Sequence, residues 1–565
     1  MQQKKIRLGE LLVKSNIIDE KQLEQAIAHQ KSTGERLGDA LMALGYISEK
    51  TFLSFLSEQL NIPLIDLKKY NIDLEKARDL PEAYARNYHA VLLSQRQGKP
   101  FVGMADPLDI TATDEISKVL GRPIETALVS PAGLNHILDA IYRRTQEIAD
   151  YAEALQQEVG EDSLLAELDA EDDTETSAPV IKLLQSMFED AIQVGASDIH
   201  IEPDEHSLRL RLRVDGVLQE HIIKKKNIAS AIALKLKLMA NLNIAERRLP
   251  QDGRFNIKIS EHVVDIRLST MPIKYGESIV MRLLDQSGSD IGLENIGMPE
   301  DTLKRFRSLL KEPHGVILVT GPTGSGKSTT LYGGLQELDT PGINIISIED
   351  PIEYQLPRIN QVQVNEKLEL TFARVLRTTL RQDPDIIMVG EMRDEETAVI
   401  AMRAALTGHL VLSTLHTNDS ASTALRLIDM GVEGFFVAAV LRGVLAQRLV
   451  RKICTGCSTK YQLTEHEKAW LDGIASPTVI EKANVRHGAG CTYCNNTGYK
   501  GRIGVFELLE LDASMMEALR KDDPSAFYKA AEIALKGQLL VDNGLALVNE
   551  GVTTVDEIIK ISGET

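Results

Sequence analysis

A phosphate-binding loop is the clearest chemical signal in this sequence. The residues from Gly321 to Ser328 read GPTGSGKS and fit the pattern G-x-x-x-x-G-K-[ST]. Glycines at these spacings allow positive φ angles, so that successive backbone N–H groups can surround phosphate oxygens. Lys327 would reach the β- and γ-phosphates, and Ser328 would bind Mg²⁺. A strand-like GVILVT precedes the loop and a helix-forming STTLYGGLQEL overlaps its end. We therefore predict an ATP site formed by Gly321, Pro322, Thr323, Gly324, Ser325, Gly326, Lys327, Ser328 and Thr329.

Two acidic segments could supply the carboxylates that ATP hydrolysis needs to orient water and metal. The apolar run in PDIIMVGE ends at Glu391, although Gly390 stands where an aspartate usually follows such a run. In SIEDPIEY, Glu349 and Glu353 lie at the end of another apolar run, where ligands collect in open α/β sheets. We predict that Glu391, Glu349 and Glu353 take part in catalysis. The alternative is that they are solvated acids at strand ends.

Further cations must offset the negative charge that develops on the γ-phosphate. Three arginines lie in strand-like segments before the phosphate-binding loop: Arg254 in QDGRFN, Arg267 in DIRLST and Arg282 in VMRLL. Each is a candidate for this role, and the alternative for each is an ordinary salt-bridged arginine.

All four cysteines of the chain fall into two C-x-x-C pairs, Cys454/Cys457 and Cys491/Cys494. Two such pairs can present four thiolates tetrahedrally, which suits a structural Zn²⁺ with no open position for water. A pair of disulfides is the competing interpretation, and a cytosolic location would disfavour it.

The chain begins with a sequence segment that occurs twice, here called the duplicated phrase. Residues 7–30 align without a gap on residues 36–59, with identical residues at eight of 24 positions. Much of each copy has helical apolar spacing, so a small duplicated helical fold is one interpretation. Arg7, Gly9 and Gln30, with their counterparts, are not needed for a core. Two equivalent sets of this kind suit a ligand with two equivalent halves, such as cyclic di-GMP, because arginine pairs bidentately with guanine or phosphate.

These residues must be positioned by four successive regions. Residues 1–145 are mostly helical at first and then mixed, and residues 146–178 form an acidic segment predicted to be a flexible or partly helical linker. Residues 179–290 are rich in strands, and SLRLRLRVDGVL alternates apolar and basic residues as a half-buried strand does. Residues 291–565 alternate short apolar runs with helical stretches, which predicts a largely parallel sheet covered on both faces.

Charge and hydropathy exclude some classes of protein. The net charge is −19, but residues 145–181 contain 12 acidic and no basic residues, so the acidity is local. The sequence has no stripe of basic residues interleaved with aromatic ones, which is the pattern that would indicate nucleic-acid binding. No apolar run reaches the length of a membrane span. We expect a cytoplasmic protein that meets the membrane only peripherally, through a partner.

Five motifs in order, GASDIHIEP, GPTGSGKSTTLY, IEDPIEY, DPDIIMVGEMRD and TGHLVLSTLHTND, resemble the secretion ATPase family that powers type II secretion and type IV pilus assembly. The resemblance covers about residues 180–565. It implies a RecA-like P-loop core preceded by an α+β, PAS-like domain that supplies arginines to the phosphates. It also implies catalytic Glu391, with the Gly390–Glu391 ending as the family's own pattern, an acidic box over 349–353 and a histidine box of His409 and His416 that senses the γ-phosphate. A tetracysteine zinc insert, a homo-hexamer and an inner-membrane platform partner are implied too.

The duplicated phrase resembles the tandem RLGxx-type motifs of the N-terminal receptor domain of MSHA-pilus extension ATPases, which bind cyclic di-GMP. Asn16, where the second copy has Gly45, is a small departure. The resemblance implies a cyclic di-GMP site formed by Arg7, Leu8, Gly9, Leu11, Leu12, Gln30, Arg36, Leu37, Gly38, Asp39, Leu41, Gln59 and Asp106.

We therefore expect an ATP-hydrolysing hexameric motor for pilus assembly or secretion, regulated by cyclic di-GMP. A DNA-uptake or DNA-transfer ATPase is an alternative within the same class. A nucleotide-gated binding switch with little turnover is an alternative from a different class.

Overall fold

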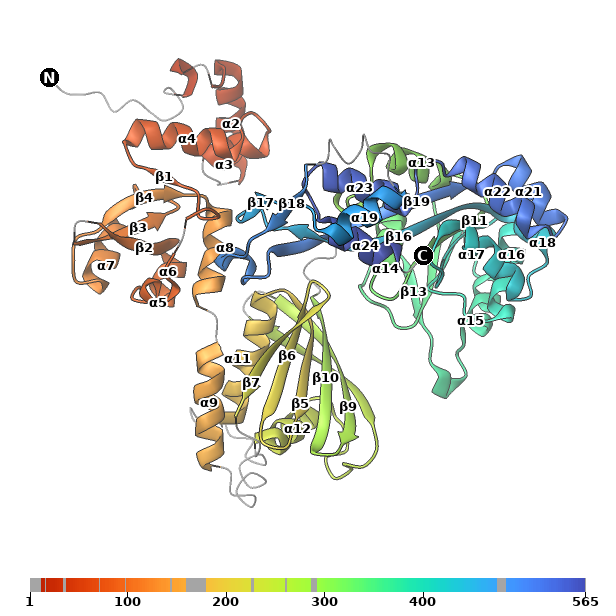
Figure 1. Cartoon of the computed structure of the whole chain (residues 1–565), viewed down its shortest axis with the longest axis horizontal. Coiled ribbons are helices and arrows are strands. Elements are labelled where there is room, and N and C mark those ends of the chain that lie inside the picture. The colour runs from red at the N-terminus through yellow and green to blue at the C-terminus, as the bar shows by residue number, and fades with distance from the viewer. Residues whose placement is uncertain are drawn as a thin grey trace. The chain divides into compact units, whose positions relative to one another are not determined.

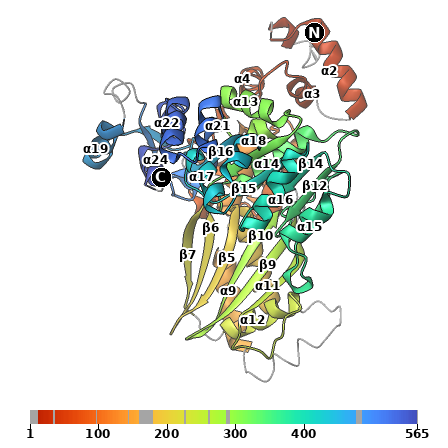
Figure 2. The same cartoon turned by 90° about the vertical axis from the view of Figure 1, so that its right-hand side faces the viewer.

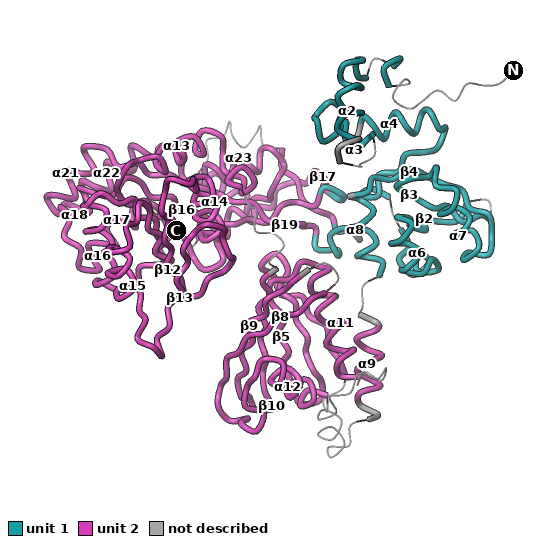
Figure 3. Tube along the Cα trace, turned by 180° about the vertical axis from the view of Figure 1, so that it is seen from behind, with its two compact units in different colours: residues 1–143, 455–457, 490–497 teal, residues 144–454, 458–489, 498–565 magenta. Residues whose placement is uncertain are grey.

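The computed structural model describes residues 12–15, 17–33, 37–70, 72–96, 98–142, 145–158, 179–224, 228–259, 262–285, 292–474 and 484–563. The chain forms two compact units (Figure 3). The first comprises residues 1–143, 455–457 and 490–497, and the second comprises the rest. Among the described residues, no helix is long and apolar enough to cross a bilayer.

The first unit contains two small cores. One is built by the helices of the duplicated phrase, and its centre includes the fully buried Leu12 and Leu41. The other lies on a four-stranded sheet of order β1-β4-β3-β2, which the shorter helices cover. The elements are α2 (Glu20–Thr33), α3 (Leu37–Ala43), α4 (Glu49–Leu60), β1 (Leu64–Ile65), α5 (Leu74–Ala77), α6 (Glu82–Asn87), β2 (Ala90–Arg96), β3 (Lys99–Met104), α7 (Ile110–Val119), β4 (Glu125–Val129), α8 (Pro131–Ile141) and the short η4 (Thr492–Cys494).

The second unit begins with a six-stranded antiparallel sheet of order β7-β6-β5-β10-β9-β8, against one face of which three helices pack (Figures 1 and 2). Alternation decides which face is buried: Leu208, Leu210 and Leu212 enter the core, and the arginines between them lie on the other face. The elements are α9 (Thr145–Glu158), α11 (Pro179–Gln193), β5 (Ala196–Pro203), β6 (Leu208–Val214), β7 (Val217–Ile223), α12 (Ile228–Met239), β8 (Gln251–Ile259), β9 (His262–Ile273) and β10 (Gly276–Asp285).

The acidic segment over 146–178 was expected to be a flexible or partly helical linker, and its start is helical and also contributes to a core. Residues 145–158 form α9, and Ile148, Ala152 and Leu155 are buried against α11 in the core of the strand-rich region. These three residues recur at spacings of four and three, so they share one face of a helix that apolar burial can hold in place. Residues 159–178 lie outside the described part of the chain.

The rest of the second unit is an α/β core, as the sequence predicts. Its seven-stranded sheet has the order β13-β12-β14-β15-β11-β16-β19, with every neighbouring pair parallel except β16 and β19. Successive residues of β11 enter separate apolar cores on the two faces, which explains why the whole strand is apolar.

The strands of this sheet are β11 (Gly315–Thr320), β12 (Ile345–Glu349), β13 (Asn360–Gln363), β14 (Ile386–Val389), β15 (Leu410–Leu415), β16 (Leu441–Ile453) and β19 (Tyr499–Glu510). Two further strands, β17 (Ser458–Lys460) and β18 (Arg486–Gly488), form a separate two-stranded sheet. The helices are η2 (Leu293–Asn295), α13 (Glu300–Leu310), α14 (Lys327–Leu338), η3 (Glu366–Leu368), α15 (Phe372–Thr379), α16 (Glu395–Leu406), α17 (Ser420–Asp429), α18 (Gly434–Val440), α19 (Glu465–Ile474), α21 (Ala513–Arg520), α22 (Pro524–Ala534), α23 (Leu540–Asn549) and α24 (Val555–Ser562).

Candidate nucleotide site

The phosphate-binding loop joins the buried strand β11 to the first turn of α14. Gly324 and Gly326 have φ angles of 80° and 89°, so both lie in the left-handed region that glycine tolerates best. Close packing adds a second requirement, because a Cβ on Gly326 would lie 2.8 Å from Nε2 of Gln447. Lys327 begins α14, where the helix dipole favours an anion. The local pattern read from the sequence therefore forms the expected loop.

Lys327 is held on its own loop. Its Nζ donates hydrogen bonds to the carbonyl oxygens of Gly321 at 2.8 Å and Pro322 at 3.0 Å. Burial lowers the pKa of Lys327 to about 8, an effect that Arg448 reinforces and Glu391 opposes. A bound phosphate would replace the two carbonyl acceptors with a full negative charge.

A pocket of about 820 Å³ opens over this loop and brings segments from distant parts of the sequence together. Its lining includes Thr323, Gly324, Gly326, Lys327, Ser328 and Thr329 of the loop, the acids Glu349, Asp350, Glu353 and Glu391, and His416. It also includes Arg213 and Arg282 from the strand-rich sheet and Arg502 from β19. This convergence joins phosphate ligands, carboxylates and cations in one cavity.

Glu391 lies two residues after the end of β14, and it lines the pocket over the phosphate-binding loop. Its Oε1 lies 2.5 Å from Nη2 of Arg393, and its Oε2 lies 3.5 Å from Nε2 of His416. The ion pair raises the pKa of the Arg393 guanidinium. A Cβ on Gly390 would make a tight contact of 3.2 Å with the carbonyl oxygen of Ile348, so the neighbouring strand favours a glycine there. Arg393 was not predicted from the sequence, although it stands two residues from Glu391.

The two glutamates of the acidic box differ in environment. Glu349 is buried, and its carboxylate accepts hydrogen bonds from Tyr332, Ser347 and Gln361. Burial and the nearby carboxylate raise the pKa of Tyr332, so this phenol remains a donor. With three protein donors on its oxygens, Glu349 is better suited to holding the segment in place than to polarising water. Glu353 is more accessible and pairs with Arg267 at 3.1 Å.

The three predicted arginines share one neighbouring cavity of about 550 Å³, and each has a protein partner in this structure. Arg254 bonds Asp265 at 2.8 Å, and Arg282 bonds Asp198 at 3.1 Å. Arg267 also donates to the carbonyl oxygen of Ile352 at 3.0 Å. Of the three, Arg282 also lines the pocket over the phosphate-binding loop.

The two histidines of the expected histidine box lie at opposite ends of β15. His416 follows the strand and reaches Glu391, whereas His409 precedes it and its Nδ1 lies 2.8 Å from the carbonyl oxygen of Ala404. A six-residue strand is about 20 Å long, so the two imidazoles are separated by the length of β15 and lie at opposite strand ends. The assignment of His409 to the γ-phosphate is therefore corrected for this structure.

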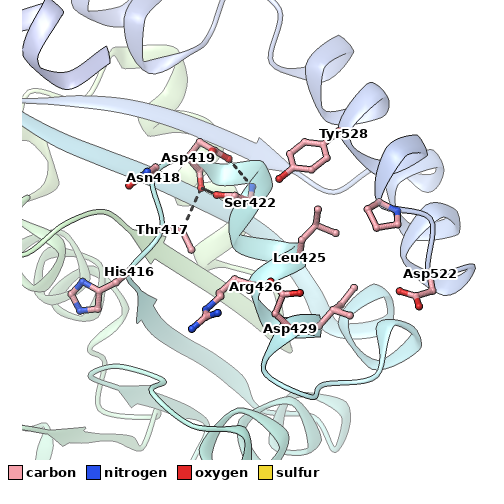
Figure 4. A pocket seen from close by; sticks show the side chains of 12 residues that line it. His416, Thr417, Asn418, Asp419, Ser422, Leu425, Arg426, Asp429, Asp522 and Tyr528 are labelled. Carbon is pink, nitrogen blue, oxygen red and sulfur yellow. Dashed lines mark hydrogen bonds between the residues drawn. The ribbon is translucent and has the colours of Figure 1, made fainter. Parts of the chain in front are cut away.

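His416 also lines a second pocket, of about 710 Å³, between α17 and the start of α22 (Figure 4). Asp419 lies there as the N-cap of α17 and accepts a hydrogen bond from the backbone N–H of Ser422 at 2.6 Å. The histidine thus lies where the two pockets approach each other.

The four cysteines form a compact cluster. All four sulfurs lie within 4.8 Å of one another; the sulfurs of Cys491 and Cys494 are 3.7 Å apart, and those of Cys457 and Cys494 are 3.8 Å apart. These separations exclude disulfides in this structure, because an S–S bond is about 2.05 Å long. Tetrahedral Zn²⁺ with Zn–S distances of about 2.3 Å places its sulfurs about 3.8 Å apart. The donor set therefore fits the expected zinc site, including Cys454.

The expected dinucleotide site is only partly within the described residues. Arg7, Leu8, Gly9, Leu11 and Arg36 lie outside them, as does the side chain of Asp39. Leu12 and Leu41 are fully buried, and a Cβ on Gly38 would lie 2.5 Å from the Phe52 ring, so these three serve packing in this structure. The remaining candidates are more accessible: Leu37, Gln30 and Asp106 are half-buried and Gln59 is exposed.

Comparison with known proteins gives two matching family models. One, described as type II/IV secretion system protein, matches residues 173–560, and the other, described as MshEN domain, matches residues 60–148.

Three individual proteins are also similar. The chain is 40% identical to the type IV pilus assembly ATPase PilB of Myxococcus xanthus over 559 residues, which covers 98% of each chain. It is 42% identical to the type II secretion system ATPase E of Vibrio cholerae over 503 residues, which covers 87% of this chain and 98% of that one. The solved structure of the Legionella pneumophila ATPase DotB shares the fold, with a TM-score of 0.52, 21% identity, and coverage of 70% of this chain and 98% of that one.

Proposed function

This chain belongs to the type II/IV secretion system protein family and is a P-loop ATPase, and from that premise we propose that it is a hexameric motor regulated by cyclic di-GMP. The work it performs is assembly of a type IV pilus, such as an MSHA-like one, or type II secretion. One observation carries the motor proposal. Arg213 and Arg282, from a different sheet, line the same pocket as the phosphate-binding loop and Glu391. Movement of that sheet would therefore depend on the charge of the bound nucleotide.

In the catalytic step, Glu391 orients and deprotonates the attacking water, while Lys327 and the arginines offset charge on the phosphoryl oxygens. Mg²⁺ would be held by Ser328 and would neutralise the β- and γ-oxygens. Glu349 keeps the acidic box in place, and Glu353 would leave Arg267 and instead bind water molecules that surround Mg²⁺.

Phosphate release by the full chain, together with its mass by light scattering, tests this proposal. We expect turnover that rises with assembly into hexamers, and a loss of about 100-fold or more in kcat for Glu391→Gln with nucleotide affinity retained. Absence of turnover at any protein concentration would instead indicate a binding switch. Strong stimulation by DNA would favour a DNA-uptake ATPase.

The cyclic di-GMP proposal has separate support. The MshEN domain model matches residues 60–148, next to the duplicated phrase over residues 7–59. Leu12, Leu41 and Gly38 serve packing, whereas the side chains of Gln30 and Gln59 are half-buried and exposed, respectively. Each half of the dinucleotide would pair with one copy.

Calorimetric titration of cyclic di-GMP into the full chain, with the ATP site saturated by Mg·ADP, tests this assignment. We expect the double variant Arg7→Ala/Arg36→Ala to weaken binding by at least about 100-fold, since each charged pair contributes about 1.5–3 kcal/mol. Arg122→Ala, an exposed arginine of the same unit, serves as the control and should bind normally. Equal affinities for the double variant and the control would reject the site.

We propose further that the cysteine cluster holds a structural Zn²⁺. Its support is the short separation of the four sulfurs, all within 4.8 Å of one another, and a backbone N–H of Cys491 that donates to Sγ of Cys494 at 3.3 Å and would stabilise a thiolate. Metal analysis should find about one zinc ion per chain, and Cys457→Ser should lower both zinc content and Tm. A metal-free chain with unchanged Tm after chelation would contradict this proposal.

A further inference from the structure

A buried glutamine on β16 lies beneath the phosphate-binding loop. Gln447 is only 2% exposed, and its side-chain amide makes two hydrogen bonds to the loop and to the helix that follows. Its Nε2 donates to the carbonyl oxygen of Ser325 at 2.8 Å. Its Oε1 accepts a hydrogen bond from the hydroxyl of Thr330 at 2.7 Å.

The two partners fix the orientation of this amide. A carbonyl oxygen can only accept, so the NH₂ end of Gln447 must face Ser325, which leaves the oxygen for the Thr330 hydroxyl. Thr330 is itself fully buried in the first turn of α14. The amide therefore connects the loop, the helix and β16 with no freedom to flip.

The bond to Ser325 has a consequence on the opposite side of the peptide unit. In a trans peptide the C=O of one residue and the N–H of the next point in opposite directions. Because the Ser325 carbonyl is drawn toward Gln447, the N–H of Gly326 is directed away from β16. Gly326 lines the pocket over the loop, on the side of the chain where phosphates are expected to bind.

Steric contacts of β16 enforce the same arrangement. A Cβ on Gly321 would lie 2.4 Å from the carbonyl oxygen of Gln447, and one on Gly326 would lie 2.8 Å from its Nε2. Arg448, also 2% exposed, donates to that same carbonyl oxygen at 3.1 Å and to the carbonyl oxygen of Asn418 at 2.7 Å. The hydrogen bonds of Arg448 thus hold β16 in place, and the phosphate-binding loop packs closely against this strand.

We infer that Gln447 is a positioning residue for ATP binding: its amide holds the Ser325–Gly326 peptide with the N–H toward the phosphates, and Thr330 keeps that amide in its working orientation. The inference rests on the ATPase activity and does not depend on which machine the motor serves. It predicts an effect on nucleotide affinity that exceeds any effect on the chemical step.

Nucleotide affinity in full-length variants tests the inference, with Kd for ADP and KM and kcat for ATP as readouts. Gln447→Leu should weaken ADP binding and raise KM about tenfold, while kcat at saturating ATP changes less than about threefold, because one positioned hydrogen bond contributes about 1 kcal/mol or slightly more. Thr330→Val should weaken binding by a smaller factor, about threefold. The double variant should match Gln447→Leu alone, since Thr330 acts through the amide.

Thr553→Val is the matched control, because the buried Thr553 hydroxyl donates to the carbonyl oxygen of Arg451, four residues along the same strand. It should lower Tm and leave Kd unchanged. If Gln447→Leu lowers Tm in the same way with Kd within about twofold of wild type, Gln447 is merely structural and the inference fails. Should Gln447→Leu not fold, an unchanged Kd in Thr330→Val overturns the inference on its own.

Discussion

At the scale of single residues, Lys327 makes nucleotide binding sensitive to pH. Its pKa of about 8 in the nucleotide-free protein reflects burial first, and Arg448 lowers it further while Glu391 raises it. A triphosphate at Nζ favours the charged form, so the pKa rises on binding. Above pH 8 the free protein is increasingly neutral at this site and must take up a proton to bind ATP.

We therefore expect KM for ATP to be flat below about pH 7.5 and to rise by up to about tenfold per pH unit above pH 8. Calorimetry in buffers of different ionisation enthalpy should show proton uptake over the same range. Lys327→Arg cannot titrate there, so its ADP affinity should not vary with pH. If KM for ATP of the wild-type protein stays constant up to pH 9.5, titration of Lys327 does not control nucleotide binding.

At the scale of elements, a buried ion pair attaches the C-terminal helix α24 to β16. Arg451 donates to Glu557 from its side chain at 2.8 Å and from its backbone N–H at 3.0 Å. Burial alone would raise the pKa of Glu557, but these bonds and one from Lys560 lower it from 4.5 to about 2. A depressed pKa of a carboxylate stabilises the folded state above its unfolded pKa, and this contribution is lost as pH falls toward 2.

Glu557→Gln should therefore lower the free energy of unfolding by about 3 kcal/mol at pH 7, with the difference shrinking below pH 4.5. Urea unfolding at a series of pH values measures this difference. Glu532→Gln, on the exposed side of α22, provides the comparison and should have little effect at any pH. If the free energy of unfolding lost in Glu557→Gln does not vary with pH, the residue stabilises the fold by packing and not by its charge.

At the scale of the whole molecule, the strand-rich sheet is attached to the acidic box of the ATPase core through Arg267. One guanidinium bonds both the carboxylate of Glu353 and the carbonyl oxygen of Ile352, which lie 86 and 85 residues further along the chain. Both contacts are made by one guanidinium nitrogen, Nη2. The contact of Arg267 with Glu353 thus holds the nucleotide-free state, and our proposed cycle requires that Glu353 leave Arg267.

Arg267→Ala should reduce kcat by about tenfold or more and increase hydrogen exchange in residues 350–356, because the segment loses two bonds. Arg267→Lys, which keeps the positive charge and has enough N–H donors for both acceptors, should retain more activity than the alanine variant. Arg209→Ala, on the same polar face of the sheet but outside both cavities, should leave kcat near wild type. An alanine variant with normal kcat and exchange would show that this contact plays no part in the cycle.

Local patterns in the sequence predicted the local parts of this molecule. The phosphate-binding loop, the alternating strand around Leu210 and the apolar β11 follow from neighbouring residues, because glycine freedom and side-chain alternation act over a few positions. Glu391 was found in the same way, at the end of an apolar run. The family resemblance and the α/β fold class were confirmed by the comparisons and by the sheet.

By itself, then, the sequence predicted which loop would bind phosphates and which sulfurs could share a metal, and it determined which runs become buried strands. Only the tertiary structure decided that His416 reaches Glu391 while His409 does not, that Glu349 is occupied by three donors, that α9 joins a core, and that Gln447 supports the loop. These outcomes depend on strand order and on contacts between residues far apart in the chain. Spacing along a sequence does not specify which residues meet across a sheet, because that is settled by how its strands pair and pack.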